Sequence, residues 1–291
     1  MWCSFFLLLL SSCVTKAPPL PETRPVSSRV PPSAPQDDPA AGLTFDRLKA
    51  VTPGSLSLAF LLEADNPRAE AAHVRAAAWK IAVNGVERNG EGDLSMEGGT
   101  LAAGSSGTYP LRLETPLAAE MFPDLPGPEG EAELTVDIVF AYASGEEITI
   151  PVSAAAAFPP VREPEVRITA IAVQKAELIN TRFKISLKID NPNSFPVELS
   201  AFNYELYNAG RLWADGVRED ILTVPPESSA ETDIFLVMNF TNMSRDLLNQ
   251  IAALRDIHYR FTGKATVSTG IEYLPQFTIT YDLSGYSRVV D

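Results

Sequence analysis

The sequence predicts an all-β protein made of two tandem antiparallel β-sandwich domains, each with one short helix. Three observations predict this fold. Apolar residues alternate with polar ones over runs of about ten residues, which is typical of half-buried strands. Turn signals such as Asn84-Gly85 separate these runs. The same order of runs occurs twice along the chain, which indicates two copies of one unit.

The N-terminal leader is the first element. Its apolar core, Phe5 to Leu10, is far shorter than the roughly 20 apolar residues that span a bilayer, and it fits the central region of a secretory signal. The next residues, Leu10-Ser11-Ser12-Cys13, resemble the lipobox of bacterial lipoproteins. That resemblance implies a signal peptide at residues 1–12 and lipid on Cys13, so the expected partner is a membrane. The residue after Cys13 is Val14 and not Asp. By analogy with the sorting of lipoproteins in Gram-negative bacteria, this favours the outer membrane, with the protein facing the periplasm or the cell surface.

A proline-rich linker follows the leader. Together with Cys13 it makes up the predicted region 13–42. Val14 to Gly42 contains eight prolines in 29 residues. Such segments stay extended at roughly 3 Å per residue, so this one predicts a spacer several nanometres long. A PxxP ligand for another protein is the alternative.

Charge and cysteine usage exclude several classes of function. The formal net charge of −14 opposes phosphate binding, so nucleic acid is not an expected partner. The acidic residues are scattered, which indicates a solvated surface more than a cation-attracting face. Cys3 and Cys13 both lie in the leader, so the body has no disulfide, thiol nucleophile or Cys-based zinc site. His73 and His258 are too far apart for metal-ligand spacing, and we expect no cofactor and no metal.

The internal repeat sets the predicted domains. An offset of 125 superposes Asp65-Asn66-Pro67 on Asp190-Asn191-Pro192, and an offset of 123 aligns the strands that follow. The predicted domains are therefore residues 43–160 and 161–291. Phe158 to Val166, with three prolines, is expected to form a short, stiff connector between them.

Two segments of the repeat need a decision between helix and strand. The Ala-rich segment from Ala69 to Trp79 has helical propensity, but the repeat aligns it with a strand, and Val74, Ala76 and Ala78 keep period 2. We therefore predict a strand. Asn242 to Ile257 has apolar residues at helical spacing and predicts the helix of the second domain. Its counterpart in the first domain is shorter, at Leu117 to Phe122.

The second domain carries the clearest strand pattern. Residues 181–190 place Phe183, Ile185, Leu187 and Ile189 on one face. Asn208-Ala209-Gly210 and Thr269-Gly270 are further hairpin signals.

These residues resemble a known family, the LEA type 2 or WHy domain (water stress and hypersensitive response). The resemblance rests on the strand ending in Asn191-Pro192-Asn193 and on the strand beginning near Pro225, and it covers about residues 166–283. Through the repeat it extends to about 43–157, where the motif is Asn66-Pro67-Arg68. It implies a sandwich similar to fibronectin type III or immunoglobulin domains. It also implies a role in desiccation or stress protection with no catalytic residues.

Candidate sites have alternative readings. The Asn-Pro motif could be a calcium loop, since Asp and Asn oxygens are hard ligands, but one local carboxylate is few, and a structural turn fits the residue types better. The aromatic residues of the second domain could line a groove or fill the core; they are Tyr204, Tyr207, Trp213, Phe235 and Phe240. Paired acids such as Glu146-Glu147 and Glu219-Asp220 are weak signals for a glycosidase.

The sequence therefore predicts a non-enzymatic, lipid-anchored protein of the cell envelope that acts in desiccation or stress protection. The alternative is an interaction scaffold in an envelope or secretion complex, which would bind a still unidentified protein through exposed sheet edges. A hydrolase is the third hypothesis; it has no recognisable motif such as G-x-S-x-G to support it.

Overall fold

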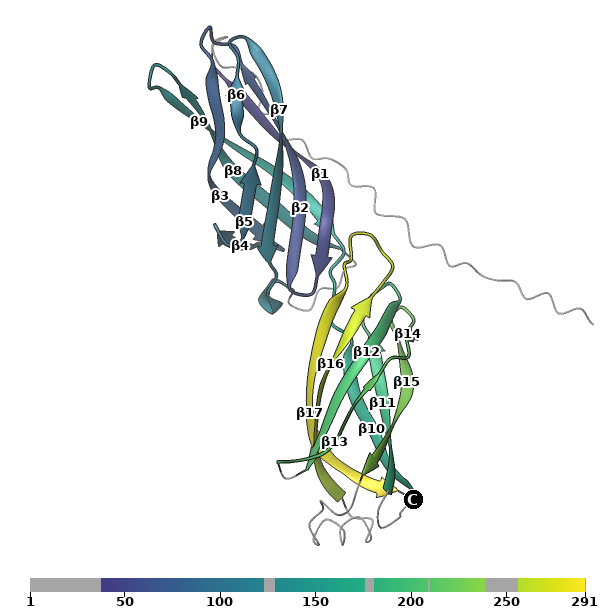
Figure 1. Cartoon of the computed structure of the whole chain (residues 1–291). Coiled ribbons are helices and arrows are strands. Elements are labelled where there is room, and N and C mark those ends of the chain that lie inside the picture. The colour runs from purple at the N-terminus through teal and green to yellow at the C-terminus, as the bar shows by residue number, and fades with distance from the viewer. Residues whose placement is uncertain (1–37, 123–128, 176–180, 209, 239–255, 291) are drawn as a thin grey trace, which may run out of the picture.

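The computed structural model describes residues 38–122, 129–175, 181–208, 210–238 and 256–290. They form two elongated β-units, one with strands β1–β9 and one with strands β10–β17 (Figure 1). Among the described residues, no strand of one unit pairs with a strand of the other. The all-β prediction is confirmed. The predicted signal peptide, Cys13 and the spacer up to residue 37 lie outside the described residues.

The first unit has two sheets that face each other. One has the order β1-β2-β7-β5, and the other has the order β4-β3-β8-β9 with β6 paired to β3. All of these pairs are antiparallel. The strands are β1 (Ala40–Thr52), β2 (Ser55–Asn66), β3 (Ala72–Val83), β4 (Val86–Asn89), β5 (Asp93–Met96), β6 (Gly99–Leu101), β7 (Ser105–Pro116), β8 (Gly130–Tyr142) and β9 (Glu147–Phe158).

The second unit is one continuous sheet folded into two layers. Its order is β13-β12-β16-β17-β10-β11-β15, with β14 paired to β12. A short parallel contact between β10 and β17, at Ile171–Val289 and Ala172–Val290, joins the two layers. The strands are β10 (Glu165–Lys175), β11 (Thr181–Asn191), β12 (Val197–Asn208), β13 (Arg211–Arg218), β14 (Leu222–Val224), β15 (Ser228–Met238), β16 (Asp256–Ser268) and β17 (Phe277–Val290).

Strand alternation builds the core as predicted. The four apolar side chains of β11, at Phe183, Ile185, Leu187 and Ile189, are all fully buried. Successive side chains of a strand point to opposite faces, so these four line the interior while their neighbours face solvent. Burial of such side chains supplies the main stabilisation of each unit.

The Ala-rich segment is a strand, β3, so tertiary pairing overrides its helical propensity. Its period is nevertheless interrupted. Pairing with β8 shifts between Ala76 and Trp79, which is a β-bulge. Val74 is buried, but Ala78 is exposed, contrary to the predicted inward face, because the bulge changes the alternation at this point.

Of the three predicted hairpin turns, Asn84-Gly85 is the one with which the structure fully agrees. Asn84 and Gly85 have φ of 48° and 81° and join β3 to β4, as the Asn-Gly signal predicts. Asn208 ends β12 and Gly210 has φ of 75°, while Ala209 lies outside the described residues. Thr269-Gly270 does not form a tight hairpin, because residues 269–276 all belong to the connection between β16 and β17.

The helix predicted for Asn242 to Ile257 falls mostly on residues 239–255, outside the described part of the chain. Asp256 and Ile257 begin β16, so the predicted end of the helix is wrong. In the first unit, the predicted short helix is a 3₁₀ turn at Ala119–Met121. No helix in the described ranges has the length and apolarity to cross a membrane.

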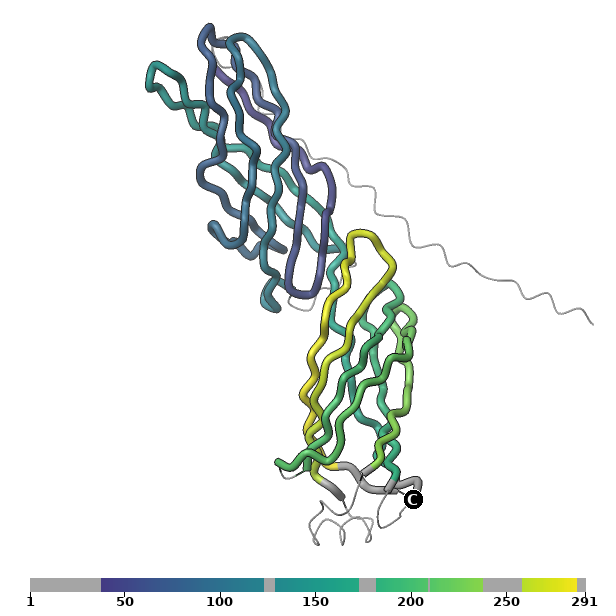
Figure 2. Tube along the Cα trace, in the orientation of Figure 1, coloured from purple at the N-terminus to yellow at the C-terminus, as the bar shows by residue number. Residues whose placement is uncertain are grey.

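The two units meet end to end through a connector and one loop. The connector, residues 159–164, buries Val161 and Pro164. The loop between β16 and β17 reaches the first unit, where the Tyr273 carbonyl oxygen accepts a hydrogen bond of 2.9 Å from the Val51 amide (Figure 2). Leu274 is buried beside it.

Candidate functional site

The second unit buries a polar side chain at Asn191, the last residue of β11. It is 2% exposed. Its Nδ2 donates to the carbonyl oxygens of Phe195, Val224 and Pro225 at 2.8, 3.3 and 3.0 Å. Its Oδ1 accepts from the Asn193 amide at 3.0 Å, which is the Asx-turn geometry of asparagine. A buried amide needs such partners, and here they tie three backbone segments together.

Asn193 extends these bonds to the connector between the units. Its Oδ1 accepts from the Arg162 amide at 2.8 Å, and its Nδ2 donates to the Arg162 carbonyl oxygen at 2.9 Å. The same Nδ2 also contacts Asn191 Oδ1 at 2.9 Å. Asn193 therefore binds the backbone of the incoming segment in the way that a neighbouring strand would.

The first unit repeats the buried asparagine. Asn66, fully buried at the end of β2, donates from Nδ2 to the carbonyl oxygens of Glu70 and Ala102 at 2.8 and 3.2 Å. Adding 125 to Asn66 and Glu70 gives Asn191 and Phe195, and adding 123 to Ala102 gives Pro225. The turn geometry at the two positions is therefore built from corresponding residues.

Two further bonds recur at the same offsets. The Gly104 amide donates to the Arg68 carbonyl oxygen at 3.0 Å, and the Glu227 amide donates to the Asn193 carbonyl oxygen at 2.9 Å. Both donors have positive φ, 64° at Gly104 and 47° at Glu227. The Asn-Pro turn is thus held by one bonding pattern in both units.

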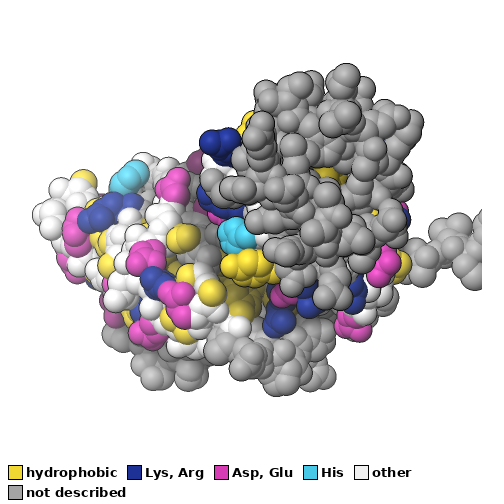
Figure 3. All heavy atoms as spheres, turned by 90° about the horizontal axis from the view of Figure 1, so that it is seen from below, with side chains coloured by type: hydrophobic (Ala, Val, Ile, Leu, Met, Phe, Trp, Pro, Cys, Tyr) yellow, Lys and Arg dark blue, Asp and Glu magenta, His cyan; other side chains and the backbone are white. Residues whose placement is uncertain are grey.

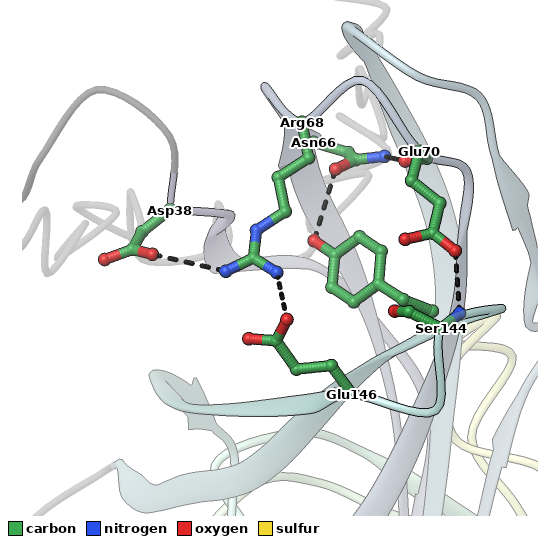
Figure 4. Close-up of polar contacts among 7 residues, drawn as sticks. Asp38, Asn66, Arg68, Glu70, Ser144 and Glu146 are labelled. Carbon is green, nitrogen blue, oxygen red and sulfur yellow. Dashed lines mark hydrogen bonds and ion pairs between the residues drawn. The ribbon is translucent and has the colours of Figure 1, made fainter.

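The third motif residue differs between the units. Arg68 replaces the asparagine, and its Nη1 donates to Glu146 Oε2 at 2.8 Å while its Nη2 lies 3.6 Å from Asp38 Oδ1 (Figure 4). Its guanidinium also sits 4.8 Å from the centre of the Tyr142 ring, and the Tyr142 hydroxyl donates to Asn66 Oδ1 at 3.2 Å.

Charge and burial shift the pKa values at this turn. The hydrogen bond from Arg68 holds the pKa of Glu146 below its usual value. Burial raises the pKa of the Tyr142 hydroxyl. Asp38 precedes β1 as Arg162 precedes β10, so in both units the third motif residue contacts the segment that leads into the unit.

The geometry disfavours a calcium loop at the motif. Arg167 bonds Asp190 Oδ2, at 3.0 Å through Nε, and Lys188 lies 3.4 Å from Oδ1. The Arg167 hydrogen bond lowers the pKa of Asp190. Both carboxylate oxygens therefore already face cations. Pro192 is exposed and Pro67 half-buried in their turns. Within the described ranges, no group of three or more His, Cys, Asp or Glu side chains could hold a metal ion.

The histidines and aromatic residues that the sequence singled out do not come together in one site among the described residues. His73 and His258 are exposed on different units, and His258 packs edge-on against Tyr286 at 5.1 Å between ring centres. Tyr204 is in the core, stacked on Phe261, whereas Phe235 is 55% exposed. Tyr207 and Trp213 are half-buried, and Phe240 lies outside the described residues.

Three of the four acids in these pairs lie within ion-pair distance of an arginine. Glu146 and Glu147 pair with Arg68 and Arg75, and Asp220 lies 3.4 Å from Arg218. On the face seen in Figure 3, acidic and basic side chains are interspersed in the described part, with no single-sign patch.

One comparison with known proteins gives a family match, and it lies in the second unit. Residues 186–282 match the family model of the late embryogenesis abundant proteins of type 2 (LEA_2). This match supports a LEA type 2 domain in the second unit. No curated protein sequence matches the chain.

Solved structures resemble the chain weakly. A protein from Archaeoglobus fulgidus is 17% identical, with 44% of this chain and 97% of that one covered and a TM-score of 0.29. Red sea bream transglutaminase is 12% identical, with 86% and 31% covered and a TM-score of 0.24. A chain of the CsuC–CsuE chaperone–tip adhesion subunit complex of Acinetobacter baumannii is 14% identical, with 76% and 90% covered and a TM-score of 0.21. At these scores the likenesses carry no conclusion about function.

Proposed function

We propose that the chain is a non-enzymatic lipoprotein of the cell envelope, with two tandem LEA type 2 domains that act in desiccation or stress protection. The observation that carries this proposal is the family match over residues 186–282, whose first strand ends at the buried Asn191 turn. The corresponding hydrogen bonds of Asn66 support a second, divergent copy at residues 43–160.

Membrane attachment is the second part of the proposal. The lipobox-like Leu10-Ser11-Ser12-Cys13 and the proline-rich spacer support lipid on Cys13 and a place at the outer membrane. We expect Cys13→Ala to move the protein from the membrane fraction to the soluble fraction. Cys3→Ala is the matched control and leaves the protein in the membrane, because residue 3 is removed with the leader. A mature N-terminus upstream of Cys13 in mass spectrometry would contradict the anchor.

Protection is tested by drying or freezing a labile enzyme with the purified protein. The proposed function predicts more enzyme activity after recovery than with an equal mass of an unrelated acidic protein. Equal recovery in the two samples would remove the stress-protection role and leave the anchor untouched.

A scaffold function is the second candidate. Exposed apolar side chains on the outermost strands β13 and β15 favour it, since unpaired edges bind other chains. Its partner would be a protein of the envelope or of a secretion complex.

A further inference from the structure

The first unit contains two Asn-Gly pairs whose surroundings differ. They are Asn84-Gly85, which joins β3 to β4, and Asn89-Gly90, at the end of β4. An asparagine that precedes a glycine is prone to spontaneous deamidation, because glycine has no Cβ to keep its amide nitrogen away from the asparagine side chain. The two pairs have the same residue types, so any difference in reactivity in the folded protein comes from the structure around them.

Deamidation is a reaction within the chain that consumes only water. The glycine amide nitrogen loses its proton and attacks Cγ of the asparagine, and a five-membered imide ring closes as the side-chain nitrogen leaves as ammonia. Water then adds to one of the two imide carbonyl groups and opens the ring, which gives either aspartate or isoaspartate. The attack requires the asparagine side chain and the following peptide to rotate, so it depends on local opening of the structure.

Asn84 is held against this rotation by two other segments of the chain. Its Nδ2 donates to the Met121 carbonyl oxygen at 2.8 Å, and its Oδ1 accepts from the Glu131 amide at 2.9 Å. Its own backbone amide donates to the Glu131 carbonyl oxygen at 2.8 Å. The side chain is also half-buried. Three hydrogen bonds must therefore break before its Cγ can approach the Gly85 nitrogen.

Asn89 lacks such anchors. It is the exposed last residue of β4, a strand of four residues at the edge of its sheet. Pairing with β3 ends at Lys80 and Asn89, so Gly90 lies just beyond the ladder. Within the described ranges, no hydrogen bond or ion pair holds the Asn89 side chain. Gly90 is exposed, and nothing lies within 4 Å of the position that a Cβ would take there. The end of a short edge strand opens at low cost.

A carboxylate at position 89 would change this edge of the sheet. It would lie opposite Lys80 and next to Arg88, whose guanidinium bonds to the carboxylates of Glu91 and Glu120. Aspartate adds one negative charge to the formal −14 of the chain and leaves the backbone unchanged. Isoaspartate also inserts a methylene group into the backbone, which disturbs the register after Arg88 and weakens the last pair of the ladder.

We propose that Asn89 is a site of spontaneous deamidation in the folded protein, where water converts it to aspartate and isoaspartate, and that the hydrogen bonds of Asn84 protect the other Asn-Gly pair. The reaction needs no partner, cofactor or enzyme. The inference is therefore independent of the envelope and stress-protection functions, and it can fail or hold without them.

Peptide mapping of the purified full-length protein tests the proposal after incubation at mildly alkaline pH and physiological temperature. Trypsin cleavage after Lys80, Arg88 and Arg112 places Asn84 in peptide 81–88 and Asn89 in peptide 89–112, each with a single asparagine. We expect peptide 89–112 to gain about 1 Da with time and to resolve into two forms in chromatography. Peptide 81–88 should change at least about tenfold more slowly, because hydrogen bonds must break first. A digest at zero time corrects for reaction during proteolysis.

The same protein unfolded in guanidinium chloride is the matched control. Both peptides should then react at similar rates, because the contacts that protect Asn84 are gone. In the folded protein, Asn89→Gln should abolish the acidic band that appears in isoelectric focusing, since the longer side chain closes its ring far more slowly. Asn203→Gln, at an exposed asparagine of the second unit, should leave that band unchanged.

Three results would overturn the proposal. The first is equal rates at Asn84 and Asn89 in the folded protein. The second is an unreactive Asn89 in the folded protein when the unfolded protein reacts at both sites, because the fold would then protect both pairs. The third is an acidic band that persists in Asn89→Gln.

Discussion

The side-chain amide of Asn193 pairs with the backbone of Arg162 through two hydrogen bonds, 2.8 and 2.9 Å long. The two residues are far apart in sequence, and the first belongs to the motif while the second belongs to the connector between the units. The motif therefore fixes the point at which the second unit is joined to the first.

Asn193→Ala should destabilise the second unit. The change removes both bonds to Arg162 and the contact with Asn191, which should cost about 1–3 kcal/mol of unfolding free energy in urea titrations. Hydrogen exchange at the Arg162 amide should accelerate. Asn203→Ala is the control, because its exposed amide bonds to Ala201 on its own strand, and it should change stability by less than about 0.5 kcal/mol. An unaltered Arg162 exchange rate would contradict this account.

Gly104 and Glu227 occupy corresponding positions with positive φ, and substitutions there should change stability in opposite directions. Gly104→Ala should lose about 1 kcal/mol, because a side chain in the left-handed region is strained although the space around Gly104 is open. Glu227→Gly should be neutral or gain about 0.5 kcal/mol, since relief of strain exceeds the added chain entropy. Thermal unfolding measures both changes. Gly54→Ala, at an open position outside the left-handed region, should not be destabilising, and a loss there equal to that at Gly104 would speak against backbone strain as the cause.

Gly263→Ala should be much more damaging than Gly104→Ala. A Cβ at Gly263 would lie 2.0 Å from the Asn203 carbonyl oxygen and 2.2 Å from the Tyr281 hydroxyl, and that hydroxyl already donates to the same carbonyl at 2.5 Å. Backbone and a buried ring would both have to move, so we expect a loss of about 3 kcal/mol or more. Gly42→Ala, where a Cβ meets nothing within 4 Å, should be tolerated. Similar denaturation midpoints for the two variants would refute the steric explanation.

Acid should weaken the second unit through its ion-paired carboxyl groups. Hydrogen bonds from Lys184 and Ser186 hold the pKa of Asp233 below its ordinary value. A carboxyl group with a lowered folded-state pKa stabilises above its unfolded pKa, near 4, and this contribution disappears as pH falls through the folded value. The urea midpoint should therefore decline below about pH 5, and less steeply in Asp233→Asn.

Lys184→Met provides the matched test of that pair. It should flatten the pH dependence as Asp233→Asn does, and the double variant should add little, because both changes remove one interaction. If the two effects are fully additive, the Lys184–Asp233 pair is not the cause of the pH dependence.

Local pattern predicted the strands but not the contacts between distant segments. Period 2 is a property of the chain itself, so the buried face of β11 was predictable residue by residue. The bulge in β3 depends on how β8 pairs with it, and for that reason Ala78 was assigned to the wrong face. The Asn191 turn was predicted from residue type, whereas its bonds to Val224 and Pro225 depend on a segment more than thirty residues away. The order of the strands in the sheet of the second unit is likewise not encoded by the alternation of apolar and polar residues.

The third motif residue is Arg68 in the first unit and Asn193 in the second. This difference sets which residues each unit needs in the segment that precedes it. Asn193 binds main-chain atoms, which every residue except proline offers, so the side chain at position 162 is free to diverge among the other residue types without loss of these bonds. Arg68 binds the carboxylates of Asp38 and Glu146, so the first junction depends on particular acidic residues and should loosen as ionic strength rises. The junction at the start of the first unit should therefore be more sensitive to salt than the Asn193–Arg162 contact between the units.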